Sequence, residues 1–370
     1  MEGPIAFYVH HHGNGHRART EAILGHIDEP VVIFTSDPNY TTKHRNVQIK
    51  VIPPDFGKES GQYVSTTSAA THYLPAPSPL YSRRTAVLVE HLCNLQPSVL
   101  VVDVSTEVAL QARLCGIPTI IVRQHGERKD LPHAIAYQDA VALIAPFPSV
   151  LEDVETPNDV VSKTEYTGVF SRYVESDRVD QTEAKELLAL PKTTPMILLM
   201  TGNGGTDVDL KTLTAVADAH PKNVFVTIGQ ITRDRSHRIP KNLRIDGWTA
   251  DPSLHLSAAD VVATSAGHNC VMEAATFQSS LITIPEERPF HEQHRKCAAL
   301  ENAGLSQTLG SWNASVSEWS QSLDKALSFD RRLWDPLLLK SGARSAAETI
   351  SKTSKRIYQT GPAPNKQLVS

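Results

Sequence analysis

The sequence predicts two α/β domains of the doubly wound, Rossmann-like type, each with a parallel sheet that helices cover on both faces. Three observations support this fold class. The chain of 370 residues is long enough for two domains of ordinary size. Short apolar runs alternate with helix-like stretches in both halves, which is typical of parallel sheets. In each half a glycine-rich loop follows an early apolar run, at the place where such sheets bind ligands.

In the first half, apolar runs predict strands, and stretches of helical periodicity separate them. The expected strands cover residues 5–9, 31–35, 47–52, 99–103, 119–122 and 141–145. The expected helices cover residues 17–24, 85–94 and 106–114. Residues 55–82 are rich in Gly, Ser, Thr and Pro, and so long a loop inside a domain is usually functional or disordered.

The same alternation begins anew after Arg172. The expected strands of the second half cover residues 196–200, 224–228, 243–246, 261–263 and 281–284. Its expected helices cover residues 182–190, 209–220 and 268–277. We therefore place the first domain at residues 1–170 and the second at residues 171–340. A last helix at 343–358 and a frayed tail make up residues 341–370.

Composition and charge indicate an ordinary cytoplasmic protein. Apolar residues make up 40% and charged residues 21%, and the net charge of −4 predicts no attraction to nucleic acid. The four cysteines form no CxxC pair, so we expect reduced core thiols. No stretch approaches the ~18 apolar residues that span a bilayer, and no basic segment precedes an apolar run at the N-terminus.

Residues 261–300 form the most informative stretch of the chain. A strand-like end leads through small polar residues into a helical run, and a second apolar strand stops at Pro285. The turn at Ser265, Gly267 and His268 places free backbone N–H groups and the positive end of a helix dipole at the carboxyl edge of a sheet, where phosphate binds well. Glu273, nearly two turns into the helix, can accept hydrogen bonds from ribose hydroxyls.

This stretch resembles the donor-site signature of MurG-type glycosyltransferases, family 28 and its relatives, which have the two-domain GT-B fold. In that family a Gly is followed by Glu six residues later, by Pro twelve residues after the Glu, and then by a Gln-containing pair. Gly267, Glu273, Pro285 and the pair Glu292-Gln293 match this spacing. Glu292 departs from the bacterial MurG pattern, which usually has a second Gln there. The resemblance implies two domains facing across a cleft, a last helix that returns to the first domain, and a UDP-sugar held by the second domain, with Glu292 and Gln293 on the sugar.

A second motif joins a strand to a helix at residues 12–17 of the first half. Gly13, Asn14 and Gly15 allow the backbone to approach a ligand closely, and family 28 enzymes have a similar Gly-x-Gly-His loop on the acceptor side. His16 is the candidate general base, because imidazole titrates near working pH and a positioned base contributes about 10²–10⁴-fold in rate. The alternatives are that His16 caps the helix or only orients the acceptor.

Three further histidines at residues 10–12 raise the question of a metal site. Four histidines at a strand end cannot all point one way, because side chains alternate along a strand. We therefore expect no metal ion and no cofactor.

Three more positions face the donor by resemblance to the family. Gly204 lies in a second glycine loop, Arg172 occupies the place where a guanidinium neutralises the leaving diphosphate, and Trp248 lies where relatives hold the base. Each has a structural alternative, respectively a tight turn, a solvated linker arginine and an aromatic at the cleft wall.

The acceptor side is predicted from the ends of two other strands. Asp103 ends one strand, and His125 lies in the loop after the next, where the family has an acceptor-facing loop. Glu127, in the same loop, is a second catalytic candidate, because with Asp103 it could supply the acidic groups that an epimerase needs. Arg83 and Arg84 are expected to be solvated, with contact to an anionic acceptor or a membrane surface as the alternative.

The predicted function is transfer of a sugar from a nucleotide diphosphate to an acceptor hydroxyl. No Asp-x-Asp pair stands at a strand end, so we expect metal-independent transfer, and the resemblance alone implies inversion at the sugar carbon. The alternatives are an enzyme like UDP-N-acetylglucosamine 2-epimerase, which shares the fold, and a non-catalytic nucleotide-sugar sensor. The acceptor is open between a polyprenyl-linked lipid, a small glycoside and a protein. A lipid-linked acceptor would place the protein at the inner face of the membrane.

Overall fold

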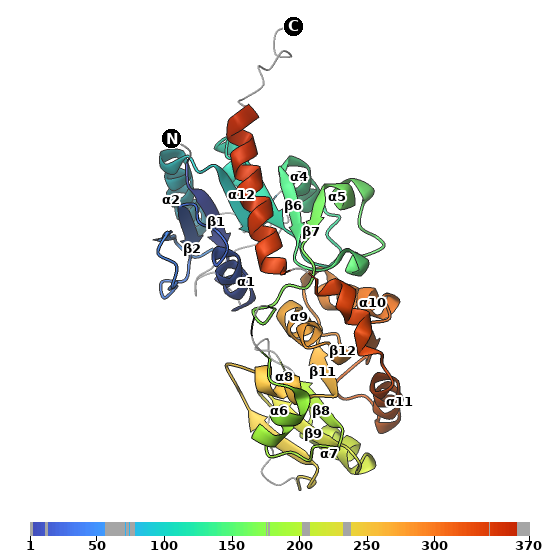
Figure 1. Ribbon diagram of the computed structural model, residues 1–370. Coiled ribbons are helices and arrows are strands. Elements are labelled where there is room, and N and C mark those ends of the chain that lie inside the picture. The colour runs from blue at the N-terminus through green and yellow to red at the C-terminus, as the bar shows by residue number, and fades with distance from the viewer. Residues whose placement is uncertain are drawn as a thin grey trace.

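A computed structural model describes two α/β domains arranged end to end (Figure 1). It covers residues 3–11, 14–55, 71, 74, 78–174, 176, 178–201, 208–231, 238–339 and 341–360, with residues 14 and 358–360 described by their backbone alone.

The first domain contains a seven-stranded parallel sheet in the order β3-β2-β1-β4-β5-β6-β7. Its strands are β1 (Ile5–Val9), β2 (Val31–Thr35), β3 (Val47–Val51), β4 (Val99–Asp103), β5 (Thr119–Val122), β6 (Ala142–Ala145) and β7 (Thr164–Tyr166). Its helices are α1 (Asn14–Leu24), α2 (Pro79–Leu95), α3 (Thr106–Leu114), α4 (Leu131–Asp139), α5 (Asn158–Lys163) and the 3₁₀ turn η2 (Ser149–Leu151). Successive residues of β1 belong to two different core clusters, one on each face of the sheet, which explains why the strand is apolar throughout.

The second domain contains a six-stranded parallel sheet in the order β10-β9-β8-β11-β12-β13. Its strands are β8 (Met196–Met200), β9 (Val224–Ile228), β10 (Leu243–Gly247), β11 (Val261–Ser265), β12 (Ser280–Ile284) and β13 (Ser306–Thr308). Its helices are α6 (Gln181–Leu187), α7 (Leu210–Ala219), α8 (Ser253–Ala258), α9 (His268–Thr276), α10 (Glu292–Asn302), α11 (Val316–Leu327), η3 (Pro289–His291) and η4 (Arg331–Leu337).

The strand order reverses once in each sheet, and this reversal positions the site. In the first sheet the chain runs outward from β1 to β3 and then resumes on the other side at β4; in the second, β8 and β11 stand in the same relation. The loops after such a strand pair diverge and leave a crevice at their carboxyl ends. His16 follows β1, Asp103 ends β4, and His268 follows β11.

The C-terminal helix α12 (Gly342–Thr360) lies along the first domain (Figure 1). Its apolar residues join the core cluster that contains Ile5 and Phe7; they are Ala343, Ala346, Ala347 and Ile350. The helix begins where the chain crosses back beside the interdomain linker. A Cβ on Gly342 would lie 2.7 Å from the Val169 carbonyl oxygen, so only glycine allows the two crossing segments to pass this closely.

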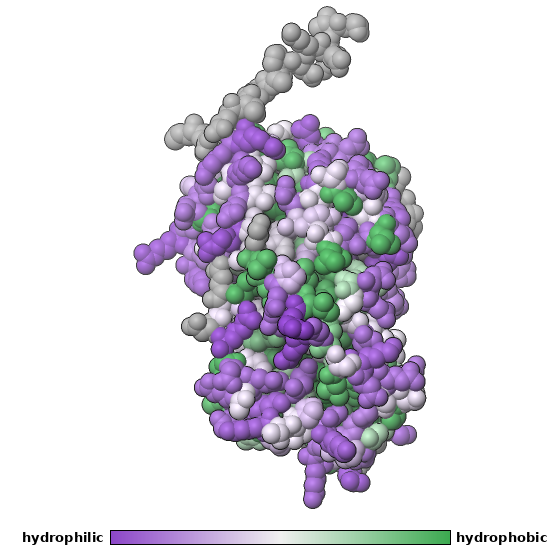
Figure 2. All heavy atoms as spheres, turned by 45° about the vertical axis from the view of Figure 1, so that its right-hand side comes forward, coloured by the Kyte–Doolittle hydropathy of each residue, from purple (hydrophilic) through white to green (hydrophobic). Residues whose placement is uncertain are grey.

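The two domains share an apolar contact and an ion pair. Phe147 and Leu151 of the first domain belong to the same core cluster as Leu300 of the second. Arg295 of α10 reaches across to Asp153, with Nε 2.6 Å from Oδ2. Figure 2 shows apolar residues around the waist of the molecule, between two more hydrophilic ends.

Several elements were not predicted, namely β7, β13, α4, α5, α8, α10 and α11. Most are short, and α10 is rich in charged residues, so its periodicity is weak. Among the residues that the structure describes, no helix is long and apolar enough to cross a bilayer.

The expectation that Arg84 is solvated is wrong. Its side chain is 1% exposed, and it donates to the Tyr8 hydroxyl and the Pro53 carbonyl oxygen, each at 2.5 Å, and to Ser36 Oγ at 2.6 Å. A buried guanidinium is tolerated here because its N–H groups are matched by acceptors from β1 and from the segments after β2 and β3.

Candidate active site

A cleft of about 500 Å³ lies between the two domains. Both sheets contribute the loops at their carboxyl ends to its walls. The predicted site residues that line it are Gly15, His16, Arg172, Trp248, Ser265, Gly267, His268, Glu273, Glu292 and Gln293. A cleft of this volume is large enough for a nucleotide-sized ligand.

On the first domain, His16 lies in the first turn of α1 against the carboxylate that ends β4. Its Nδ1 is 3.0 Å from Asp103 Oδ2, and Arg19 Nε donates to the same oxygen at 3.0 Å. Burial alone would raise the pKa of the Asp103 carboxyl, but Arg19 and His16 together hold this pKa well below its usual range. The carboxylate therefore stays ionised 3.0 Å from His16 Nδ1, which leaves Nε2 to act on a ligand in the cleft.

The sequence placed His16 and Asp103 on one side of the cleft but did not predict their contact. α1 starts at Asn14, earlier than the predicted residue 17, so His16 is held within the helix. β1 and β4 are neighbours in the sheet, which brings the residues that follow them together. Arg19 was missed, although its position one turn after His16 on the same helix was a usable signal.

On the second domain, the N-terminus of α9 opens into the cleft. Gly267 is the N-cap residue and provides no side-chain cap, so the first N–H groups of the helix remain for a ligand. The helix N-terminus of α1 lies opposite: a Cβ on Gly15 would be 3.6 Å from the Asn269 side chain. Two helix dipoles thus direct their positive ends at one space between the domains.

His268, at the start of α9, is a buried and uncharged imidazole that lines this space. It is 9% exposed, and neither ring nitrogen has a hydrogen-bond partner among the residues that the structure describes. Burial, followed by the charges of Arg19 and Lys296, holds the pKa of His268 well below its usual range. An unpaired buried imidazole is costly, and a ligand oxygen in the cleft would satisfy it.

Glu273 and Arg172 contact each other on the wall of the cleft. Arg172 Nε lies 3.0 Å from Glu273 Oε1, and Arg172 also donates to the Ala250 carbonyl oxygen at 3.2 Å. Burial raises the pKa of Glu273, and Arg172 opposes this rise. Trp248 follows β10 at the rim, and its indole is 61% exposed. All three side chains line the cleft.

Glu292 bridges the two domains at the start of α10. Its carboxylate lies 3.4 Å from Arg128 of the first domain and 3.4 Å from Lys296. With its amide nitrogen turned toward Glu292, Gln124 donates to that carboxylate at 2.9 and 3.2 Å and accepts from Arg19 at 3.0 Å. A chain of contacts therefore links the His16–Asp103 pair to the second domain.

Gln293 and Lys296 shape the backbone beside Glu292. Gln293 Oε1 accepts from the Glu286 N–H at 2.9 Å, and the fully buried Lys296 donates to the Ala266 carbonyl oxygen at 3.1 Å. Lys296 and Gln124 were not predicted, because nothing in the sequence alone indicates which residues of α10 and of the β5 loop face each other.

Three of the predicted residues do not line the cleft: Asp103 is buried beside His16, and His125 and Glu127 lie elsewhere. His125 is 3% exposed, its Nε2 donates to the Leu151 carbonyl oxygen at 2.7 Å, and burial together with Lys296 lowers its pKa to about 4. Glu127 is exposed, and its backbone N–H donates to Phe290 at 2.8 Å. Both line a separate, much smaller cavity. The predictions at Gly13 and Gly204 lie outside the described residues, as does the side chain of Asn14.

The sequence was compared with family models and with the sequences of known proteins. No family model matches the chain. A glycosyltransferase of unknown role from Methanosarcina mazei is 27% identical over 85 residues, which is 23% of this chain and 22% of that relative. The matching stretch therefore spans about a fifth of either protein.

Solved structures match over nearly the whole chain. The glycosyltransferase of kitacinnamycin has a TM-score of 0.67 at 14% identity, covering 95% of this chain and 99% of that one. MurG from Acinetobacter baumannii has a TM-score of 0.61 at 17% identity, covering 96% and 99%. The fold is GT-B. The predicted resemblance to GT-B glycosyltransferases is thereby confirmed at the level of architecture.

A third match was solved with a ligand. The spinosyn rhamnosyltransferase SpnG, complexed with thymidine diphosphate, has a TM-score of 0.57 at 14% identity, covering 97% of this chain and 96% of that one. In this chain the GT-B arrangement puts the carboxyl edges of both sheets against the same cleft.

Proposed function

We propose that this protein is a glycosyltransferase that moves a sugar from a nucleotide diphosphate to an acceptor hydroxyl. The observation that carries the proposal is the His16–Asp103 pair of one domain facing an uncapped helix N-terminus of the other across the cleft. The first supplies a base, and the second supplies an anion site; a transfer from a diphosphate needs both.

In the proposed reaction, His16 Nε2 takes the proton of the acceptor hydroxyl while the oxygen forms a bond to the sugar carbon. The bond from that carbon to the diphosphate oxygen breaks, and its electron pair leaves with the diphosphate. Asp103 stabilises the imidazolium that forms, because it remains ionised beside Nδ1. Attack opposite the leaving group inverts the sugar carbon.

The leaving diphosphate would be stabilised by the N-terminus of α9 and by His268 rather than by a metal ion. One helix-end interaction is worth only ~0.3–1 kcal/mol when exposed and up to ~2 when partly buried. Several must therefore act together, and the opposing N-terminus of α1 provides a second. The match to a structure that holds thymidine diphosphate supports a nucleotide diphosphate as the donor's leaving group.

On the donor side, Glu273 would accept from ribose hydroxyls, Trp248 would stack on the base, and Glu292 and Gln293 would contact the sugar. All four line the same cleft. We favour UDP as the nucleotide, with the acceptor a lipid-linked or small-molecule alcohol.

An epimerase has less support, because the acid proposed for it does not reach the cleft. Glu127 lines the smaller cavity, and Asp103 is already engaged by Arg19 and His16. A sensor without turnover would have no need of a base held by a buried carboxylate.

The test first measures which nucleotide or nucleotide sugar binds and then measures whether product forms. The protein is screened by thermal shift with UDP, TDP and GDP and their sugars, since a ligand at 100 times its Kd adds about 2.7 kcal/mol to the free energy of unfolding. The preferred donor is then incubated with candidate alcohols. Release of nucleoside diphosphate only when an acceptor is present supports transfer; an epimerised nucleotide sugar without acceptor, or tight binding without any product, would exclude it.

A further inference from the structure

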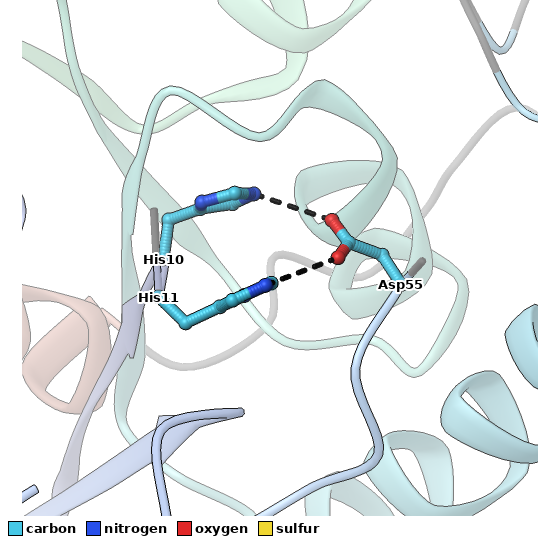
Figure 3. Close-up of side chains that lie close together, drawn as sticks. All are labelled: His10, His11 and Asp55. Carbon is cyan, nitrogen blue, oxygen red and sulfur yellow. Dashed lines mark hydrogen bonds and ion pairs between the residues drawn. The ribbon is translucent and has the colours of Figure 1, made fainter. Parts of the chain in front are cut away.

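His10, His11 and Asp55 form a compact cluster at the carboxyl edge of the first sheet, beside the site already described (Figure 3). His10 Nε2 lies 3.2 Å from Asp55 Oδ2, and His11 Nε2 lies 3.7 Å from Oδ1. The two imidazole rings are stacked, with centroids 5.0 Å apart and planes 15° apart. The prediction that the four histidines cannot all point one way is not tested by this pair, since His12 lies outside the described residues, but His10 and His11 do face the same carboxylate. β1 ends at Val9, so strand alternation no longer governs His10 and His11.

We propose that His10, His11 and Asp55 bind a divalent transition-metal ion of the zinc class. Two imidazole nitrogens and one carboxylate are a ligand set that such ions use in proteins. The three ligand atoms lie within 4.8 Å of one another. Ligand atoms ~2.1 Å from a tetrahedral ion lie about 3.4 Å from each other. The two contacts to Asp55, at 3.2 and 3.7 Å to its two different oxygens, are close to this spacing, so small side-chain shifts would bring all three ligands onto one ion.

The cluster is held in place by the buried Arg84. This guanidinium donates to Tyr8, two residues before His10, and to Pro53, two residues before Asp55. It therefore ties together the two chain segments that carry the ligands. Asp55 is itself only 4% exposed. Ligands that the surrounding structure fixes in advance lose little entropy when the ion binds.

The charge around the cluster allows a cation to bind. Arg84 adds one positive charge, but Asp55 and the buried Glu107 both lie close enough to Tyr8 to act on its hydroxyl. Among the described residues that act on Tyr8, two carboxylates face one guanidinium, and this balance favours a divalent ion at this corner.

The position of the ion would be on the acceptor side of the cleft. The rings of His10 and His16 have centroids 5.9 Å apart. With three ligands from the described part of the chain, a tetrahedral ion has a fourth position for an oxygen ligand. In a role that rests on the proposed function, this position takes an acceptor oxygen next to the base, whereas the donor phosphates remain at α9 in the other domain.

Metal binding is tested on the full chain without reference to turnover. The protein is stripped with EDTA, dialysed, and titrated with Zn²⁺ by calorimetry and with Co²⁺ by absorption. We expect one ion per chain and visible Co²⁺ bands of tetrahedral type. His11→Ala and Asp55→Asn should each weaken binding about 100-fold or more, since each removes a ligand. Melting curves should be used to check that Asp55→Asn still folds. Because His11 is partly exposed, His11→Ala tests the site even if the Asp55 variant is destabilised.

The matched control is His291→Ala, from an exposed group of Glu287, His291 and His294 that could also hold an ion. Its Zn²⁺ affinity should equal that of the wild type. Sub-stoichiometric binding by the wild type, or binding that survives His11→Ala but not His291→Ala, would overturn the site. Stripping should raise the acceptor KM and leave nucleotide affinity unchanged. An unaltered acceptor KM, with the ion bound one to one, would overturn the acceptor role alone.

Discussion

The two edges of the cleft are built by the same topology but use opposite electrostatics. The edge of the first domain is charged and already paired: Asp103 is ionised between His16 and Arg19. The edge of the second domain is neutral and unpaired at the start of α9: Gly267 provides no side-chain cap for the helix N–H groups, and both ring nitrogens of His268 lack hydrogen-bond partners among the described residues.

The difference follows from the task that each edge performs in the proposed reaction. A base must be oriented before its substrate arrives, so its partner has to belong to the protein. An anion site gains most when its donors have no partner until the anion binds, because no internal contact must then be broken. Mutations on one edge should therefore change turnover, and mutations on the other should change affinity.

The largest effect is expected at the charged edge. His16→Gln removes the base, and kcat should fall about 10²–10⁴-fold while the Kd for nucleoside diphosphate changes less than about twofold. Steady-state kinetics and calorimetry measure the two quantities. His26→Gln, just after α1 and outside the cleft, is the control and should retain full activity. If nucleotide affinity fell together with kcat, the assignment of turnover to the first domain and of affinity to the second would be wrong.

The next effect is the pH dependence of folding stability that arises from the buried imidazole of His125. His125 has a pKa of about 4 in the folded protein, below the ~6.5 of an unfolded chain. The unfolded state therefore binds more protons between these values, and stability is fully present above pH ~6.5 and is lost as the pH falls toward 4. The loss attributable to His125 is about 3 kcal/mol over that window.

Urea unfolding of the wild type and of His125→Gln at several pH values between these limits measures this loss. The variant has lower stability at pH 7, because the ring packs on Phe147, but its stability should fall less steeply with acid. Identical slopes for both proteins would show that His125 is not the group that titrates.

On the second domain, Glu273→Ala should weaken nucleotide binding about 10–100-fold, the equivalent of a charged hydrogen bond worth ~1.5–3 kcal/mol. The loss should appear in Kd and only weakly in kcat with saturating donor. Glu301→Ala, on the exposed face of α10, is the control. Unchanged affinity would remove Glu273 from the ribose site and leave it as the partner of Arg172.

The smallest effect is expected at the rim. Trp248→Ala should weaken UDP binding about 5–10-fold, since stacking of an aromatic on a base is worth ~1 kcal/mol or somewhat more. Trp248→Phe should restore most of the affinity. Pyrophosphate has no base, so its affinity should be the same in all three proteins. If Trp248→Ala also weakened pyrophosphate binding, Trp248 would have a structural role in the cleft rather than stack on the nucleotide base.

Much of this fold was predictable because strands buried on both faces are apolar throughout. The β1, β4, β8 and β9 runs match their predicted limits for this reason. Four residues of the predicted spacing, Gly267, Glu273, Glu292 and Gln293, line one cleft, since they belong to a single strand–helix–strand unit followed by a helix. Helix α10 was missed, because its polar sequence has no clear apolar face.

By itself, then, the sequence determined the fold class and the local motifs, because hydrophobic periodicity and glycine turns act over short stretches of chain. Only the tertiary structure decided which side chains meet. The contacts of Asp103 with His16, of Gln124 with Glu292, and of Asp55 with His10 join segments far apart in the chain. Such contacts depend on strand order and on the angle between the domains, and no pattern within one segment encodes either.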